Sequence, residues 1–98
     1  MASLSYTDDN GLEQLIQLGD APILIGRDPA CDLATANPGV SRRHCRIAPL
    51  PTGGWGVTDL GSSHGTDVEG RRVQRARLKD GDLVMCGASF GVTFFEVP

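Results

Sequence analysis

The sequence has few aromatic residues and almost no lysine. Its 98 residues include one Trp, one Tyr and three Phe, and Lys79 is the only lysine among nine cationic side chains. Proteins that bind nucleic acid combine a basic surface with aromatic side chains on which bases stack. Because the net charge at pH 7 is −3, the composition does not favour nucleic acid as a partner.

The sequence also lacks a long apolar run and a cysteine framework. No segment approaches the roughly 18 apolar residues of a membrane span. The opening residues, MASLSYTDDNG, lack the basic and apolar regions of a signal peptide. The three cysteines are far apart in sequence, so they predict neither a disulfide framework nor a metal site. We expect a reducing, cytoplasmic setting, with no membrane, metal or cofactor.

Glycine and proline are abundant, and no segment has the pattern of a long helix. Thirteen glycines and six prolines are spread along the chain, which predicts many turns between short strands. The expected strands are residues 4–6, 13–18, 22–27, 45–47, 55–57, 66–68, 71–73, 83–85 and 92–97.

The strand pattern and the chain length together predict the fold class. The run ILI at residues 23–25 indicates a strand buried on both faces, and residues 34–40 are expected to form a loop. A chain of this length suits one domain. We therefore predict a single all-β domain, residues 1–98, with about ten or eleven short strands arranged as a sandwich.

Charge is distributed unevenly along the chain. Residues 1–40 contain one cation, Arg27, and six acids, whereas residues 41–79 contain eight cations and three acids. Arginine dominates these cations, and its planar fork matches phosphate and carboxylate oxygens two at a time. A second cluster is expected to be either a solvated surface stripe or a contact for an acidic partner; it comprises Arg71, Arg72, Arg75 and Arg77.

Three expected loops combine hydroxyl side chains, arginine and glycine. They are IGRDPACDL at residues 25–33, GVSRRH at residues 39–44 and DLGSSHGTDVEG at residues 59–70. Loops at one end of a rigid scaffold commonly carry function. Hydroxyls, backbone N–H groups and arginine together suit a dianion, so these loops predict an anion-binding site.

Ser63, His64 and nearby Asp59 contain the residue types of a hydrolase triad. Sequence neighbours rarely form a triad, and GSSHG lacks the strand–elbow–helix context of a nucleophilic serine. The segment also lacks the lysine and the following helix of a nucleotide-binding loop. We predict that the protein is not an enzyme.

The series IGRDPACDL, GVSRRH, DLGSSHGTDVEG and LKDGDLVMCG resembles a forkhead-associated (FHA) domain. Four segments in family-like order and spacing carry the resemblance, chiefly over residues 22–97. It implies an eleven-stranded antiparallel β-sandwich that binds phosphothreonine peptides through loops at one end. It also implies a Ser/Thr kinase and a phosphothreonine-containing partner, which is another protein or part of the parent chain.

The resemblance implies contacts to the phosphopeptide for five residues. Arg27 matches an arginine that contacts the phosphate or the adjacent backbone. Ser41, Arg42 and Ser63 match positions that contact the phosphate itself. His64 lies where the family more often has an asparagine that grips the peptide backbone.

Other positions match residues that shape the loops in the family. His44 resembles a buried histidine that ties the loops together, and Gly26, Gly65 and Thr66 resemble residues that hold loop conformation. The pair at residues 36–37, Ala-Asn, replaces a more typical apolar–acidic pair, so we expect the second loop to be looser than usual.

Two function classes remain open on this basis. The first is a binding module that depends on phosphothreonine, and the second is an FHA-shaped domain that docks without phosphate, through a sheet face or by self-association. A degenerate domain would be expected to have lost part of the set Arg27, Ser41, Arg42 and Ser63. The intact set favours the first class.

Overall fold

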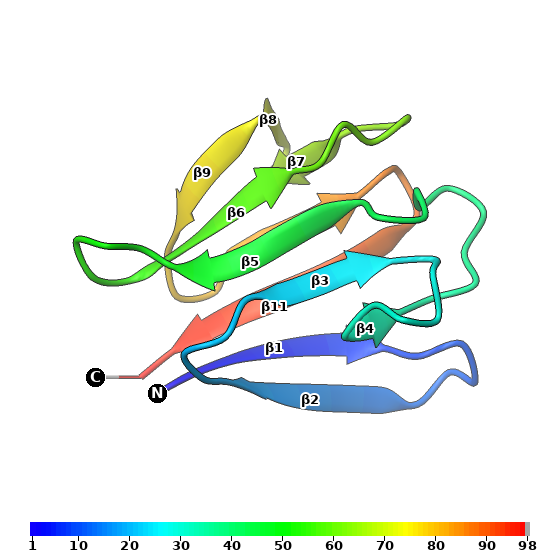
Figure 1. Ribbon diagram of the computed structural model, residues 1–98. Coiled ribbons are helices and arrows are strands. Elements are labelled where there is room, and N and C mark those ends of the chain that lie inside the picture. The colour runs from blue at the N-terminus through cyan, green and yellow to red at the C-terminus, as the bar shows by residue number, and fades with distance from the viewer. Residues whose placement is uncertain (98) are drawn as a thin grey trace.

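The computed structural model describes residues 1–97 as two β-sheets packed face to face (Figure 1). Pro98, the last residue of the predicted domain, lies outside the described residues. The strands are β1 (Ala2–Thr7), β2 (Glu13–Leu18), β3 (Ile23–Gly26), β4 (Leu33–Ala34), β5 (Cys45–Pro49), β6 (Trp55–Asp59), β7 (Thr66–Val68), β8 (Arg71–Val73), β9 (Arg75–Leu78), β10 (Leu83–Cys86) and β11 (Phe90–Glu96).

The strands form a six-stranded sheet and a five-stranded sheet. The six-stranded sheet has the order β2-β1-β11-β10-β7-β8, and the five-stranded sheet has the order β4-β3-β5-β6-β9. β3 and β4 run parallel, and the other described pairs are antiparallel. The predicted eleven-stranded sandwich is confirmed, with this one parallel pair.

Two strands lie where the sequence did not predict them. β4 occupies two residues of a segment without strand-like alternation, and it forms because Ile25 and Gly26 of β3 provide a parallel partner. β9 contains the alternation Arg75, Ala76, Arg77, Leu78, in which only Leu78 is fully buried. This alternation has the period of a strand, but its arginines were interpreted only as part of a surface cluster with Arg71 and Arg72.

The ILI run is buried on one face only, so that prediction was wrong. Ile25 is fully buried in the core, whereas Leu24 is only half-buried on the outer side of the five-stranded sheet. In a two-layer sandwich each sheet has one core face and one outer face. Alternate residues of β3 must therefore point outward.

The core fills the space between the two sheets. Its fully buried side chains include Leu4, Ile47 and Phe94. Cys45 of β5 faces Cys86 of β10 across this core, with their Sγ atoms 3.6 Å apart. The hydrogen bond with Cys86, together with burial, raises the pKa of the Cys45 thiol well above its ordinary value.

The loops that carry the predicted site lie at one end of the sandwich, and the chain termini lie at the other (Figure 1). The N-terminal amine of Met1 donates a hydrogen bond of 2.8 Å to the Val97 carbonyl. None of the described residues belongs to a helix that could cross a membrane.

Candidate functional site

Gly26 and Arg27 form the start of the first loop, which is pressed against the second. A Cβ atom added to Gly26 would lie 2.1 Å from the carbonyl oxygen of Arg42. The Arg27 backbone N–H donates to the Ser41 carbonyl at 3.0 Å, and Arg27 Nε donates to the Val40 carbonyl at 2.5 Å. Only glycine at residue 26 allows the two loops to lie this close. The close packing aligns the Arg27 side chain along the second loop.

The backbone of Arg42 is held by hydrogen bonds, whereas its side chain is exposed. Its carbonyl accepts hydrogen bonds from the Asp28 N–H at 3.1 Å and the Cys31 thiol at 3.4 Å. Within residues 1–97 its guanidinium has no hydrogen-bond partner. A charged group on a fixed backbone is therefore available to an anion.

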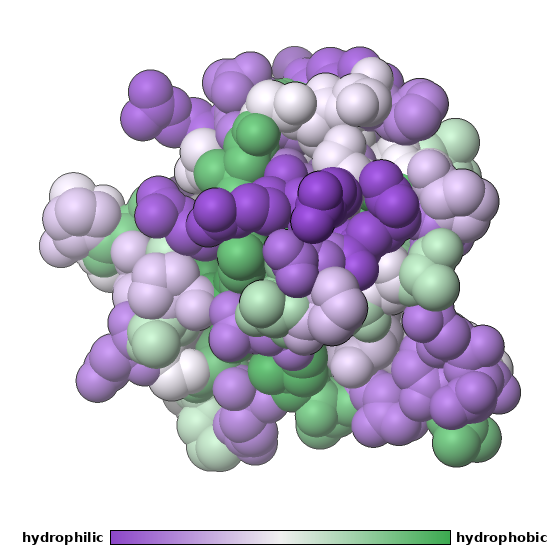
Figure 2. Space-filling view, turned by 45° about the vertical axis from the view of Figure 1, so that its right-hand side comes forward, coloured by the Kyte–Doolittle hydropathy of each residue, from purple (hydrophilic) through white to green (hydrophobic). Residues whose placement is uncertain are grey.

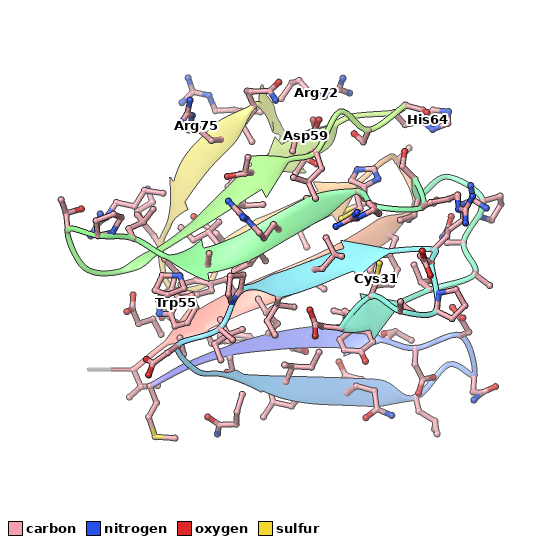
Figure 3. The ribbon with its side chains drawn as sticks, viewed as in Figure 1. Cys31, Trp55, Asp59, His64, Arg72 and Arg75 are labelled. Atoms are coloured by element: carbon pink, nitrogen blue, oxygen red, sulfur yellow. The ribbon has the colours of Figure 1, made fainter. Side chains whose placement is uncertain are left out.

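Several hydrogen bonds join the second and third loops, and one of them involves the Ser41 hydroxyl. The Ser63 N–H donates to Ser41 Oγ at 2.9 Å. Because Ser41 Oγ accepts this bond, its own O–H is free to donate elsewhere. Ser63 and His64 are exposed, and His64 lies near the tip of the third loop (Figure 3).

His44 connects the same two loops from the buried side. Its side chain is fully buried; Nδ1 accepts from the Ser41 N–H at 3.0 Å, and Nε2 lies 2.8 Å from the Gly65 carbonyl. Since Nδ1 is an acceptor, the ring proton resides on Nε2, which donates to Gly65. The imidazole thus holds Ser41 and Gly65 at a fixed separation without itself facing solvent.

Asp59 organises the third loop, a role the sequence reasoning missed. Its carboxylate accepts hydrogen bonds from the Gly61 N–H (3.0 Å), the Ser62 N–H and Oγ (3.1 and 2.5 Å) and the Thr66 hydroxyl (2.8 Å). An Asp followed by Gly and Ser two and three residues later has the donor spacing of an Asx turn. The segment DLGS at residues 59–62 contains that signal.

Burial raises the pKa of Asp59, but hydrogen bonds from Ser62, Thr66 and Gly61 outweigh it and leave the pKa below its ordinary value. A lowered folded-state pKa stabilises the fold above the unfolded pKa, about 3.9 for Asp. We predict that this stabilisation is lost as the pH falls from there through the folded-state pKa.

The Asp59→Asn variant tests this prediction. Its amide turns an acceptor into a donor that faces other donors, so we expect a loss of about 1–3 kcal/mol at pH 7. The difference from wild type should shrink below pH 4 in urea titrations monitored by Trp55 fluorescence. A difference that is constant from pH 7 to pH 3 would contradict the assignment.

Arg72 packs on the third loop from its outer side, which the sequence reasoning also missed. A Cβ atom on Gly65, where φ is +85°, would lie 2.3 Å from Arg72 Cζ. Arg72 Nε donates to the Asp67 carboxylate at 2.6 Å. Glycine is therefore favoured at residue 65 by its backbone conformation, and the exposed Arg72 guanidinium lies over it.

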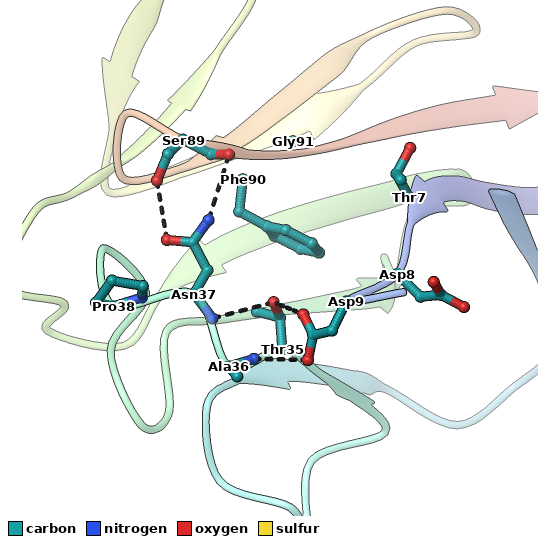
Figure 4. A pocket seen from close by; sticks show the side chains of 10 residues that line it. All are labelled: Thr7, Asp8, Asp9, Thr35, Ala36, Asn37, Pro38, Ser89, Phe90 and Gly91. Carbon is teal, nitrogen blue, oxygen red and sulfur yellow. Dashed lines mark hydrogen bonds between the residues drawn. The ribbon is translucent and has the colours of Figure 1, made fainter. Parts of the chain in front are cut away.

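A fourth loop, between β10 and β11, supports the second and third loops. The Gly87 N–H donates to the Gly65 carbonyl at 2.9 Å. Ser89 Oγ donates to Asn37 Oδ1 at 2.9 Å, and Asn37 Nδ2 donates to the Ser89 carbonyl at 3.4 Å (Figure 4). The Ala-Asn pair at residues 36–37 was expected to loosen the second loop, but both residues are hydrogen-bonded and Asn37 anchors the loop to Ser89.

The base of the second loop is held by Asp9, from the turn after β1. Its carboxylate accepts from the Thr35 hydroxyl at 2.8 Å and the Ala36 N–H at 2.9 Å. These residues line a cavity of about 570 Å³ behind the second loop (Figure 4). Asp9, one of the six acidic residues in the first 40, therefore stabilises the conformation of the second loop.

The predicted site residues all belong to three loops at one end of the sandwich. The Ser63 backbone N–H is hydrogen-bonded to Ser41 Oγ, the Arg27 N–H is hydrogen-bonded to the Ser41 carbonyl, and Arg42 follows Ser41 in the chain. With the loop end turned toward the viewer, a band of strongly hydrophilic residues crosses the middle of the surface (Figure 2). Hydroxyl donors and guanidinium groups in one place suit a phosphate group or a carboxylate.

Comparison with known proteins identifies the family. A family profile described as "FHA domain" matches residues 23–87. The FHA domain-containing protein FhaA of Mycobacterium tuberculosis is 34% identical over 92 residues, which cover 89% of this chain and 16% of FhaA. This chain therefore spans only a small part of that relative.

Solved structures give the same result for the fold. One comes from a structural and functional analysis of phosphothreonine-dependent FHA domain interactions; it has a TM-score of 0.83 and 29% identity, and the match covers 99% of this chain and 97% of that one. The FhaA FHA domain, complexed with the intracellular domain of Rv3910, has a TM-score of 0.82 and 30% identity, with 96% and 99% covered.

Proposed function

This chain belongs to the FHA-domain family, and we propose that it is a phosphothreonine-peptide-binding module that recruits a partner after a Ser/Thr kinase has acted. FHA domains are recognition modules and not enzymes. We propose that residues 1–98 act as one domain in a reducing, cytoplasmic setting, where free thiols such as Cys31, Cys45 and Cys86 persist. The partner is another protein or a segment of the parent chain.

The hydrogen bond from the Ser63 N–H to Ser41 Oγ carries the proposal. It holds the backbone of Ser63 against Ser41 Oγ and leaves the Ser41 proton free to donate. Phosphothreonine presents about −1.5 to −2 charges and three acceptor oxygens. Ser41 and Ser63 supply neutral donors, and Arg27 and Arg42 supply charge-assisted donors, which suits a dianion better than a single carboxylate. His64 is assigned to the peptide backbone beside the phosphate.

Binding to an oriented phosphothreonine peptide library tests the proposal, with phosphoserine and unphosphorylated versions alongside. We expect selective binding of phosphothreonine peptides by the wild type. Arg42→Ala removes a charge-assisted interaction of about 1.5–3 kcal/mol, so affinity should fall roughly 10- to 150-fold. Fluorescence anisotropy with the best peptide measures the change.

Arg43→Ala is the matched control, because it removes the same charge from the adjacent exposed residue. We expect its affinity to remain within about threefold of wild type, as for a peripheral surface charge. Equal losses in Arg42→Ala and Arg43→Ala would indicate general electrostatics and not a site. No phosphate-dependent binding by the wild type would overturn the proposed function.

A further inference from the structure

The outer face of the five-stranded sheet carries arginine on two of its strands. The register places Arg46 of β5 opposite Thr58 of β6, and Thr58 opposite Arg75 of β9. Side chains that are directly opposite in a sheet lie on the same face. Arg46 and Arg75 therefore flank the shorter Thr58 on the outer face.

The neighbouring row on this face has the same form. Ala48 of β5 lies opposite Gly56 of β6, and Gly56 lies opposite Arg77 of β9. Residues two apart on a strand share a face, so Arg46, Arg75 and Arg77 form one surface, which we call the arginine face. Small residues of β6 separate its two sides.

A groove of about 390 Å³ follows the middle of the arginine face and is lined by all three arginines. At the β5–β6 turn it has an apolar wall, because Leu50 folds over Gly56. A Cβ atom on Gly56 would lie 2.8 Å from Leu50 Cδ2. The groove therefore combines positive edges with an apolar end.

The three arginines of this face are unpaired. Within residues 1–97, the one ion pair joins Arg72 to Asp67, and Arg46, Arg75 and Arg77 are exposed without a side-chain hydrogen bond. The outward strand positions of this sheet hold no carboxylate, although the chain has twelve acids. Like charges on one face repel each other, and an acidic occupant would relieve that repulsion.

The fold, and not the sequence cluster, creates this surface. The four arginines between residues 71 and 77 are divided between two sheets. Arg71 and Arg72 lie on β8 of the six-stranded sheet, whereas Arg75 and Arg77 lie on β9 of the five-stranded sheet. Arg46, which is distant in sequence, completes the set.

We propose that the arginine face binds an extended, unphosphorylated acidic segment of a partner protein. Guanidinium groups pair with carboxylates in a bidentate manner. Strands in a sheet lie about 4.8 Å apart, so β5 and β9 are about 10 Å apart across β6, a width that admits one extended chain. An apolar side chain of the segment packs against Leu50.

An acidic peptide fits this face better than the alternatives. Single-stranded nucleic acid is bound largely by stacking on aromatic side chains, and the outward strand positions of this sheet carry none. The face shares no residue with the loops of the proposed phosphopeptide site. Both surfaces can therefore be occupied together, which would raise avidity for a partner that has both features.

The probe is a fluorescein-labelled, unphosphorylated, glutamate-rich peptide with one leucine, tested beside the same peptide with glutamine at each glutamate. We expect saturable binding of the glutamate peptide and amide shifts in β5, β6 and β9 in ¹⁵N–¹H NMR spectra. The glutamine peptide should bind at least about tenfold more weakly. The double variant Arg46→Glu/Arg75→Glu should weaken glutamate-peptide binding by about tenfold or more.

The matched control is Arg71→Glu/Lys79→Glu, which makes the same change in net charge at two positions that do not line this groove and should alter affinity less than about threefold. Arg46→Gln/Arg75→Gln should give an intermediate loss. The proposal fails if the control loses as much affinity, if the shifts fall on the Ser41 and Ser63 loops, or if single-stranded DNA binds more tightly. A dimer in sedimentation that disappears in Arg46→Glu/Arg75→Glu would assign the face to a second copy instead.

Discussion

Replacement of Gly26 by alanine is expected to remove a large part of the folding free energy. The new methyl group would lie 2.1 Å from the Arg42 carbonyl oxygen. The methyl position is fixed by the backbone of residue 26, and the oxygen is itself a backbone atom, so neither can rotate away. The first and second loops would have to separate, which strains the hydrogen bonds that Arg27 and Asp28 donate to the second loop. We expect a loss of about 2–4 kcal/mol.

Urea denaturation followed by Trp55 fluorescence measures the effect, and thermal unfolding should show a midpoint lower by about 10–25 °C. Gly19→Ala is the matched control, because a Cβ atom there meets nothing within 4 Å and its φ is not positive. It should change stability by less than about 0.5 kcal/mol or stabilise slightly. Equal midpoints for the two variants would contradict the close approach at Gly26.

Replacement of His44 by alanine is expected to have a comparable or larger effect. The imidazole is fully buried and holds both the Ser41 N–H and the Gly65 carbonyl. Its removal leaves the Ser41 N–H without its partner, takes one of the two donors from the Gly65 carbonyl and opens a cavity, which together cost about 3–5 kcal/mol. Because the second and third loops would separate, phosphopeptide affinity should fall even where the protein remains folded.

The control for His44 is His64→Ala, which removes the same side chain from an exposed position. Its free energy of unfolding should stay within about 0.5 kcal/mol of wild type. Peptide affinity measured well below the midpoint of each variant separates lost binding from lost folding. Unchanged stability of His44→Ala would show that the loops are held by other contacts.

The sandwich could be predicted from the sequence because a turn depends on the residues within it. Glu69-Gly70, for example, predicts the β7–β8 hairpin, and both residues have positive φ in the structure, +49° and +80°. The resemblance of four segments in their order and spacing led to the correct family. β4 was missed because its parallel pairing with β3 depends on residues already folded elsewhere.

The contacts that support the site could be predicted only in part. The donors around Asp59 follow from the spacing of DLGS, because an Asx turn is a local structure. The contact of Arg72 with Gly65 joins strand β8 to the third loop, and the contact of Asn37 with Ser89 joins the second loop to the fourth. These contacts depend on the folded arrangement of the chain, so no pattern within a short segment of sequence predicts them.

The hydrogen bond between the Met1 amine and the Val97 carbonyl has a mechanical consequence. β1 and β11 are antiparallel neighbours, with Ala2 opposite Glu96. A force that pulls the two termini apart therefore acts on the hydrogen bonds between these strands one at a time. Such a geometry unzips and does not shear, and it yields at low tension. A domain tethered at both termini would open first at the end of the sandwich opposite the binding loops. The force would reach a partner bound at those loops last.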